Sequence, residues 1–312
     1  MLKKKALRKI LITTFSIFTI FVLCIVPNKL SSNYLNPNIE VEYVNSLATD
    51  SIYLYGPNNY LVKTNVLLVD GTLDEKIENI ISYLTINKNS KLPSSLKGVL
   101  SENIIVNSIN IDGTEAVIDF SNLFNNRKDE ERIVESLTYS ITDLDGIKSL
   151  KILVDGKVVT ELPISKKKIP ESITKDFGIN KVYDIDSRNG IQKVTLYYID
   201  NINDFDYYVP VTKYINDSRE KIDIIIENLS SNYIYDKNLV SFLKSDTELI
   251  DYQIEDELML LNFNNSIFSN EKVLEETSYT LAYSIFDNYN VKTVLFEVNG
   301  VEVNKIEKEK ND

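Results

Sequence analysis

Carboxylates are the side chains of this sequence whose type and spacing come closest to a catalytic arrangement. Acidic residues cluster at 129–131 and at 255–257, and Asp119 ends an apolar, strand-like run. Two carboxylates are enough for glycoside hydrolysis, in which one serves as general acid and the other as base or nucleophile. The 312 residues include no His and one Cys, which excludes Ser-His-Asp and Cys-His catalysis and Cys/His zinc sites.

Each acidic group also has a structural interpretation. The cluster at 129–131 opens a predicted helix, where acids favour the helix dipole, and the cluster at 255–257 falls at a predicted turn. We therefore expect solvated acidic faces and no enzymatic activity. A calcium loop at 200–206 is disfavoured, because Phe205 stands where an EF-hand requires Gly. No cofactor or metal is expected.

Four tyrosines are candidate contacts for a partner or a glycan, namely Tyr197, Tyr198, Tyr207 and Tyr208. Stacking of their rings on sugars would give an alternative function, a cell-wall protein that binds peptidoglycan without catalytic activity. Adjacent residues of a strand point to opposite faces, however, and tyrosine is a good strand former. The competing interpretation is therefore that these side chains only build strands.

An internal duplication organises the chain. Short segments of the first half recur in the same order about 144 residues later. The matched segments are 75–77 with 220–222, 119–121 with 262–264, 139–141 with 283–285, and 154–156 with 298–300. This repeat predicts two copies of one domain, at 51–162 and 193–306. The second copy has Asn262 in place of Asp119, which argues against a catalytic role for that acid.

The apolar periodicity of each copy predicts two helices. Helical spacing runs over 73–84 and 133–144 in the first copy, and over 222–229 and 273–285 in the second. Strand-like runs enclose Asp112-Gly113, Asp155-Gly156 and Asn299-Gly300, which favour type I′ hairpin turns with two positive φ angles. The order strand, helix, strand, strand, helix, strand, strand predicts an α+β fold. Each copy would be a mixed β-sheet with two helices packed on one face.

The N-terminus has the pattern of a membrane helix. Five basic residues within 1–9 precede the uncharged run 10–26, and Pro27 ends it. As a helix, the run would span roughly 25 Å, near the lower limit for crossing a bilayer. Its expected lipid contacts include Ile10, Phe15, Phe18, Phe21 and Val26. The basic flank should stay inside, which places residues 28–312 outside the cytoplasmic membrane.

Two other fates of this segment stay open. A lipoprotein signal would lipidate Cys24, but Leu23 stands where a small residue is required. A cleaved signal peptide needs small residues around the cut, and Lys29 and Leu30 disturb that spacing. We expect an uncleaved anchor.

The expected organisation follows from these patterns. It comprises a cytoplasmic segment 1–9, an anchor 10–27, a tether 28–50, the first domain 51–162, a linker 163–192, the second domain 193–306 and a charged tail 307–312. The net charge of −12 argues against nucleic-acid binding. The linker triplet 166–168 is basic, and we expect it in a solvated loop that could contact an acidic partner or anionic lipid.

Two motifs carry a family resemblance. The run 108–121, SINIDGTEAVIDFS, resembles the core of the GerMN domain, and 154–157, VDGK, resembles its closing hairpin. The resemblance covers both copies. The chain is thus similar to tandem GerMN-domain proteins of spore formation or germination, whose domains resemble the ring-building motif of secretion systems. It implies a non-enzymatic structural protein in the space between mother-cell and forespore membranes. Such a protein supports assembly of an envelope complex or of the channel joining the two cells, with other envelope or sporulation proteins as partners.

Overall fold

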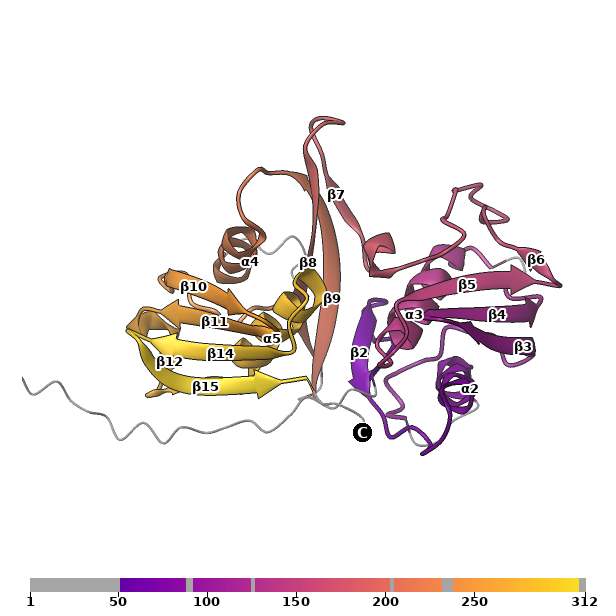
Figure 1. Ribbon diagram of the computed structural model, residues 1–312, viewed down its shortest axis with the longest axis horizontal. Helices are drawn as coiled ribbons and strands as arrows, with labels where there is room; N and C mark the ends of the chain where they lie inside the picture. Colours follow the sequence, from indigo (N-terminus) through magenta and orange to yellow (C-terminus); the bar gives the residue numbers. More distant parts are fainter. Residues whose placement is uncertain (1–50, 88–91, 125–126, 203–204, 232–237, 309–312) are drawn as a thin grey trace, which may run out of the picture. The chain divides into compact units, whose positions relative to one another are not determined.

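The computed structural model describes residues 51–87, 92–124, 127–202, 205–231 and 238–308. They belong to one compact unit and form two copies of an α+β domain (Figure 1). The expected anchor 10–27, including Cys24, and the tether 28–50 lie outside the described residues. Within the described ranges, no helix combines the length and the apolar character needed to cross a membrane.

The two copies share one order of main elements, and the second has three short additional elements before its last helix. The first comprises β1 (Ser51–Tyr55), β2 (Leu61–Asn65), α2 (Leu73–Leu84), β3 (Ile105–Asp112), β4 (Glu115–Ser121), α3 (Glu130–Thr142), β5 (Ser149–Val154) and β6 (Lys157–Val158). The linker holds η1 (Lys175–Phe177) and β7 (Val182–Asp184). The second copy comprises β8 (Ile191–Ile202), β9 (Phe205–Asn216), α4 (Lys221–Ser230), β10 (Leu249–Glu255), β11 (Leu258–Phe263), η2 (Asn265–Ile267), β12 (Phe268–Ser269), β13 (Lys272–Val273), α5 (Glu275–Asn288), β14 (Thr293–Val298) and β15 (Val301–Glu307).

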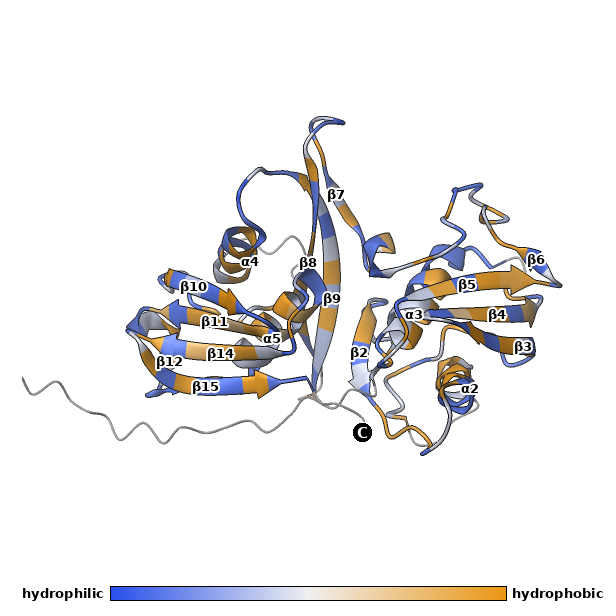
Figure 2. Ribbon diagram, in the orientation of Figure 1, coloured by the Kyte–Doolittle hydropathy of each residue, from blue (hydrophilic) through white to orange (hydrophobic). Residues whose placement is uncertain are grey.

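Each copy contains a mixed four-stranded sheet. The strand orders are β3-β4-β5-β6 and β10-β11-β14-β15, with one parallel pair in each, β4 with β5 and β11 with β14. Along β4, the side chains of Ala116, Ile118 and Phe120 are buried and alternate with half-exposed neighbours, so one face of the sheet is covered. Figure 2 shows the matching pattern on α2, which is hydrophobic on one side and hydrophilic on the other. The predicted mixed sheets and the four helices are confirmed.

The first strand of each copy turned out to be a hairpin, which the sequence pattern did not predict. β1 pairs with β2 and β8 pairs with β9, both antiparallel. The two hairpins lie in a sheet of their own, because β2 also pairs with β9 and β7 runs parallel to β9. One five-stranded sheet therefore contains strands from both copies and from the linker.

Some helix limits and one turn differ from expectation. Leu144 lies beyond the end of α3, and Val273 belongs to strand β13 rather than to α5. The β3–β4 turn has Gly113 and Thr114 at its centre, and φ is positive at Gly113 but not at Asp112 or Thr114. The predicted type I′ turn is therefore wrong there.

The other two hairpin turns agree with expectation. Asp155 and Gly156 have φ angles of 49° and 73°, and Asn299 and Gly300 have 51° and 78°. Asn, Asp and Gly tolerate this left-handed region best, so the short turn chemistry of both copies follows from the sequence.

Candidate functional site at the junction of the two copies

Equivalent tyrosines of the two copies meet at the junction. Tyr53 on β1 and Tyr197 on β8 are 144 positions apart, both are buried, and their hydroxyl oxygens lie 3.0 Å from each other. Each strand is held in the same way. The backbone N–H of Tyr53 donates to Ser140 Oγ on α3, and that of Tyr197 donates to Ser284 Oγ on α5, both at 2.9 Å. The two copies thus face each other through corresponding residues.

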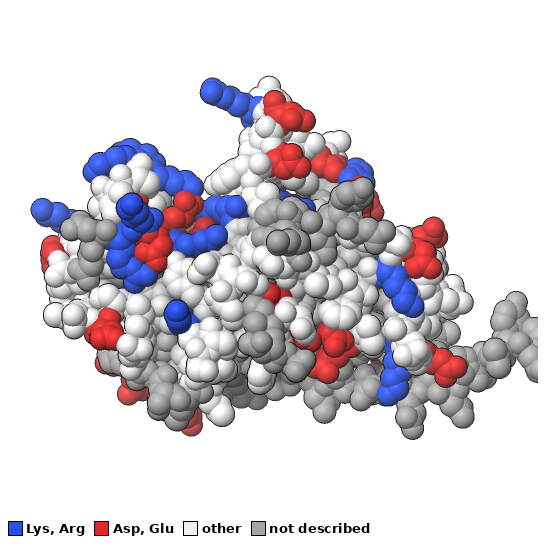
Figure 3. Space-filling view, turned by 180° about the vertical axis from the view of Figure 1, so that it is seen from behind, with Lys and Arg blue, Asp and Glu red and all other residues white. Residues whose placement is uncertain are grey.

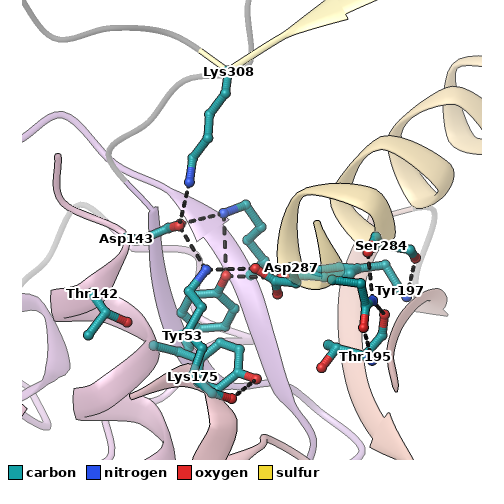
Figure 4. Close-up of polar contacts among 12 residues, drawn as sticks. Tyr53, Thr142, Asp143, Lys175, Thr195, Tyr197, Ser284, Asp287 and Lys308 are labelled. Atoms are coloured by element: carbon teal, nitrogen blue, oxygen red, sulfur yellow. Dashed lines mark hydrogen bonds and ion pairs between the residues drawn. The ribbon is translucent and has the colours of Figure 1, made fainter. Parts of the chain in front are cut away.

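A cluster of charged side chains surrounds the two tyrosines (Figure 4). Asp143, directly after α3, pairs with Nζ of Lys63 at 2.8 Å, of Lys175 at 3.1 Å and of Lys308 at 3.3 Å. Lys175 also pairs with Asp287 of α5 at 2.7 Å, and Asp287 accepts a hydrogen bond from Tyr197 at 2.8 Å. One linker lysine therefore joins a carboxylate of the first copy to its counterpart in the second. We call Lys63, Asp143, Lys175, Asp287 and Lys308 the junction cluster.

The positions of the two aspartates explain why lysines gather around them. Asp143 caps the C-terminus of α3, and Asp287 lies in the last turn of α5. The helix dipole disfavours an anion at a C-terminus. Neither helix has a basic residue in its last turn, so cations from β2, the linker and the end of β15 compensate these charges.

The pKa shifts within the cluster follow from burial and pairing. Burial alone would raise the pKa of Asp143, but Lys175, Lys63 and Lys308 hold it well below its ordinary value. Burial would lower the pKa of Lys175, and the two aspartates instead raise it well above the usual value. Burial lowers the pKa of Lys63 despite its contact with Asp143.

This chemistry fits an ionic junction better than an acid–base site. The side chains of Asp143 and Asp287 are 3% and 6% exposed, and both are paired with lysine. The general acid of a glycosidase needs a raised carboxyl pKa, which is opposite to the shift at Asp143. The cluster instead holds the two copies together.

The linker makes a second bridge through Asn180, which is buried and has a φ of 47°. Its side-chain amide donates to the carbonyls of Leu61 on β2 and Pro210 on β9, both at 2.7 Å, and its Oδ1 accepts from the N–H of Leu61 at 3.0 Å. Proline offers no N–H to a neighbouring strand. The Asn180 amide thus supplies hydrogen bonds between two strands that belong to different copies.

Asp119, the best catalytic candidate of the sequence, has a structural role. Its Oδ1 accepts a hydrogen bond from the backbone N–H of Gly156 at 3.0 Å. In the second copy, Asn262 Oδ1 accepts from the N–H of Gly300 at the same distance. Because both Asp and Asn provide the needed oxygen, the difference between the copies carries no chemical consequence for the hairpin.

The acidic cluster 129–131 is not the solvated face that we expected. Asp129 pairs with Arg127 and accepts from the Tyr55 hydroxyl. Glu130 is buried and accepts from the backbone N–H groups of Ile164 and Ser165 at 2.9 and 2.7 Å, respectively. The cluster is covered because the linker folds back on the start of α3.

Glu131 completes that contact and also involves the basic triplet. Lys167 and Lys181 both pair with Glu131, at 2.5 and 2.6 Å, and Lys168 pairs with Glu161 at 2.5 Å. Figure 3 shows basic side chains grouped around acidic ones on part of one face. Lys167 and Lys168 therefore form ion pairs within the chain, while Lys166 and Lys168 stay exposed, as expected for a solvated loop.

The acidic cluster 255–257 is exposed, as expected, and Asp200, from the segment disfavoured as a calcium loop, makes a structural contact. Glu257 pairs with Lys292 at 2.7 Å, with both side chains about half exposed, next to the turn after β10. Asp200 is buried and accepts from Asn58 at 2.9 and 3.0 Å. Among the described residues, no group of three or more Asp, Glu or Cys side chains is arranged to hold a metal ion.

The four candidate tyrosines lie mostly inside. Tyr197 and Tyr198 are each 1% exposed and Tyr207 is 7% exposed. Tyr208 packs its ring edge-on against Tyr279 and Tyr283. The structure brings all four to the shared sheet, where three of the rings are buried and Tyr208 is half-buried.

The residues of the junction were missed at the level of sequence. Asp143 and Asp287 are 144 positions apart, so the repeat contained a signal for this pair. Lys175 and Asn180 have no counterpart in the repeat because they belong to the linker. The signal in the sequence was a carboxylate near the C-terminus of a helix in both copies, because such a charge requires compensating cations.

Comparisons with known proteins agree with this architecture. The family profile described as "Germane: Sporulation and spore germination" matches residues 51–160 and 195–304. The chain is 29% identical, over 84% of its length and 74% of the other, to the spore germination protein GerM of Bacillus subtilis strain 168. Its fold is similar to the solved tandem GerMN domains of the sporulation protein GerM from Bacillus subtilis, with a TM-score of 0.75 and 27% identity over 83% of this chain and 96% of that one.

Proposed function

Because this chain belongs to the Germane family of sporulation and spore germination proteins, we propose that it is a structural component of the envelope during spore formation or germination. In this role it supports assembly of an envelope complex, such as a channel between mother cell and forespore. It acts through surfaces that bind other proteins and catalyses no reaction.

The observation that supports this proposal is the way in which the two copies are joined. Corresponding residues, a shared sheet and the junction cluster unite two small domains into one unit. The acids that could have served catalysis hold the fold together, as Asp119, Asp129 and Glu130 show. A rigid pair of similar domains suits a protein that positions partners relative to one another.

We further propose that residues 10–27 anchor the chain in the cytoplasmic membrane and that residues 28–312 lie outside it. This proposal rests on the uncharged run and its basic flank. It includes the alternative that Cys24 carries a lipid, since either device would hold the domains at a membrane surface.

Deletion of the gene in the producing bacterium tests the role. We expect fewer heat-resistant spores or slower germination, restored by the wild-type gene. Unchanged spore yield and unchanged germination would show that the proposal is wrong. A second strain in which residues 1–27 are replaced by a cleaved secretion signal tests whether tethering is needed in addition to export.

A labelling experiment tests the location, because Cys24 is the single cysteine of the chain. Ser187→Cys, in an exposed loop before β8, combined with Cys24→Ser gives one accessible thiol. A membrane-impermeant maleimide should label this variant in intact protoplasts. Labelling that requires lysis would contradict an extracytoplasmic location.

A further inference from the structure

A groove between α2 and β3 combines concave shape with acidic and apolar side chains. It is lined by Val69, Asp70, Glu75, Glu78, Asn79, Ile81, Ser82, Ile104, Ile105 and Val106, and its volume is about 750 Å³. None of these residues is Lys or Arg. The groove lies away from the junction, on elements that the proposed function has so far left unused.

The apolar part of the groove is unusually open to solvent. Ile105 at the start of β3 is 59% exposed and Val69 is 45% exposed. Leu67, two residues before Val69, is 88% exposed, the highest value among the exposed large apolar side chains of the described residues. Single exposed apolar residues are ordinary, but two that line one groove, with a third two residues away along the chain, indicate a contact surface.

The segment that carries Leu67 and Val69 is held in place. The Tyr83 hydroxyl donates to the carbonyl of Leu67 at 3.1 Å, and the N–H of Val69 donates to Asn79 Oδ1 at 3.2 Å. Both partners are on α2. The exposed apolar side chains are therefore presented by a backbone that α2 fixes, which lowers the entropy lost when a partner binds.

The charged side chains that line the groove are all acidic. Glu75 is engaged in the capping box with Thr72 at the start of α2. Asp70 and Glu78 are exposed, and no hydrogen bond or ion pair to another described residue is found for either carboxylate. A ligand with cationic side chains would neutralise these carboxylates, whereas an acidic ligand would be repelled.

The backbone beside the groove favours an extended ligand. β3 is an edge strand of the order β3-β4-β5-β6, and among the described strands only β4 pairs with it. A polypeptide in extended conformation can align with such an edge. A bulge between Val106 and Ser108 interrupts the edge, so the aligned stretch is short.

From these features we propose that the α2–β3 groove binds a short extended polypeptide segment of a partner protein in which apolar side chains alternate with Lys or Arg. The apolar side chains contact Val69 and Ile105, and the cations approach Asp70 and Glu78. This inference rests on the proposed role as an interaction component and names the site and the chemistry of one partner.

Binding is tested with three labelled octapeptides and the purified full-length protein. The first alternates Val with Lys, the second has Glu in place of Lys, and the third keeps Lys but has Ser in place of Val. Fluorescence anisotropy should show the Val/Lys peptide binding at least about ten-fold more tightly than either of the others. Equal binding of the Ser/Lys peptide would mean charge attraction alone and would overturn the proposal, as would no binding of the Val/Lys peptide.

Variants locate the binding site. The double substitution Asp70→Lys with Glu78→Lys should weaken Val/Lys binding about ten-fold or more. The control Asp251→Lys with Glu255→Lys makes the same charge change on the exposed edge strand β10 of the second copy and should leave affinity unchanged. Equal effects of the two double variants would contradict a site in the groove.

The same variants separate this inference from the function on which it rests. If the deletion strain has a spore defect that the Asp70→Lys, Glu78→Lys gene repairs fully, the groove is not the partner site while the proposed role stands. If the deletion strain has no defect, the proposed role itself fails. We expect the groove variant to accumulate normally and to leave the defect unrepaired.

Discussion

At the scale of single residues, the buried carboxylate Asp143 is the centre of the junction. It compensates Lys63 and Lys175, whose side chains are only 7% and 21% exposed. Asp143→Asn keeps the shape but leaves these cations short of a charge partner. Breaking a buried ionic group in this way costs about 3–5 kcal/mol. Urea denaturation should show a loss of that size.

An exposed ion pair supplies the control. Glu257→Gln removes the partner of Lys292 in a pair whose side chains are 53% and 44% exposed, respectively. Such pairs contribute at most about 1 kcal/mol to the free energy of unfolding. If the two variants lost the same free energy of unfolding, the junction cluster would stabilise the fold no more than an exposed ion pair does.

The depressed pKa of Asp143 predicts a pH dependence with a definite sign. A carboxylate whose pKa is lowered on folding stabilises the native state above its ordinary pKa, near 3.9, and loses that contribution as the pH falls toward the folded-state value. The stability gap between wild type and Asp143→Asn should therefore stay constant from about pH 7 to 5 and shrink below about pH 4. Denaturation series at these values measure the gap. A gap that already closes between pH 7 and 5 would contradict the assignment.

At the scale of elements, the linker acts as a third part of the junction through Asn180. Asn180→Gly preserves the positive φ but removes three hydrogen bonds to β2 and β9. We expect a loss of roughly 2–4 kcal/mol in the free energy of unfolding, because buried strand groups lose their partners. Asn270→Gly is a matched control, since Asn270 has a φ of 52° and is exposed. A comparable loss in both variants would show that the bridge contributes little.

The elements also show what the sequence could predict. Helical stripes and the repeat were sufficient for α2, α4 and the mixed sheet of each copy, because one face of each element is buried within its own copy. β2 and β9 escaped prediction, although each pairs along its length with the first strand of its own copy. The burial of Glu130 escaped because its partners, at Ile164 and Ser165, are loop backbone groups that no periodicity reveals.

Some features of the candidate site could also be predicted from the sequence, and others could not. The absence of a His-based catalyst could be deduced from composition alone. The junction cluster could not, because Lys63, Lys175 and Lys308 are far apart in sequence and only the fold brings them to Asp143. The tyrosines were singled out for their ring chemistry, whereas their positions on the shared sheet determine that three of the four are buried.

At the scale of the whole molecule, the junction predicts that the two copies unfold together. Their strands share one sheet, and separating them would expose the junction cluster and the Tyr53–Tyr197 pair. The chain contains no Trp, so a single introduced Trp can report on one copy at a time. Val117→Trp on β4 and Leu260→Trp on β11 place the reporter at half-exposed positions of the two central strands.

Urea denaturation followed by fluorescence of these two variants should give the same midpoint and the same steepness, as expected for one cooperative unit. Introducing Asp143→Asn into both reporters should then shift the two curves together, or separate them if the weakened junction lets one copy unfold first. Two distinct midpoints in the otherwise unchanged protein would show that each copy is stable without its neighbour. In that case the shared sheet would be a contact between independent domains, and the fixed spacing of partners that the proposed function requires would have no structural basis.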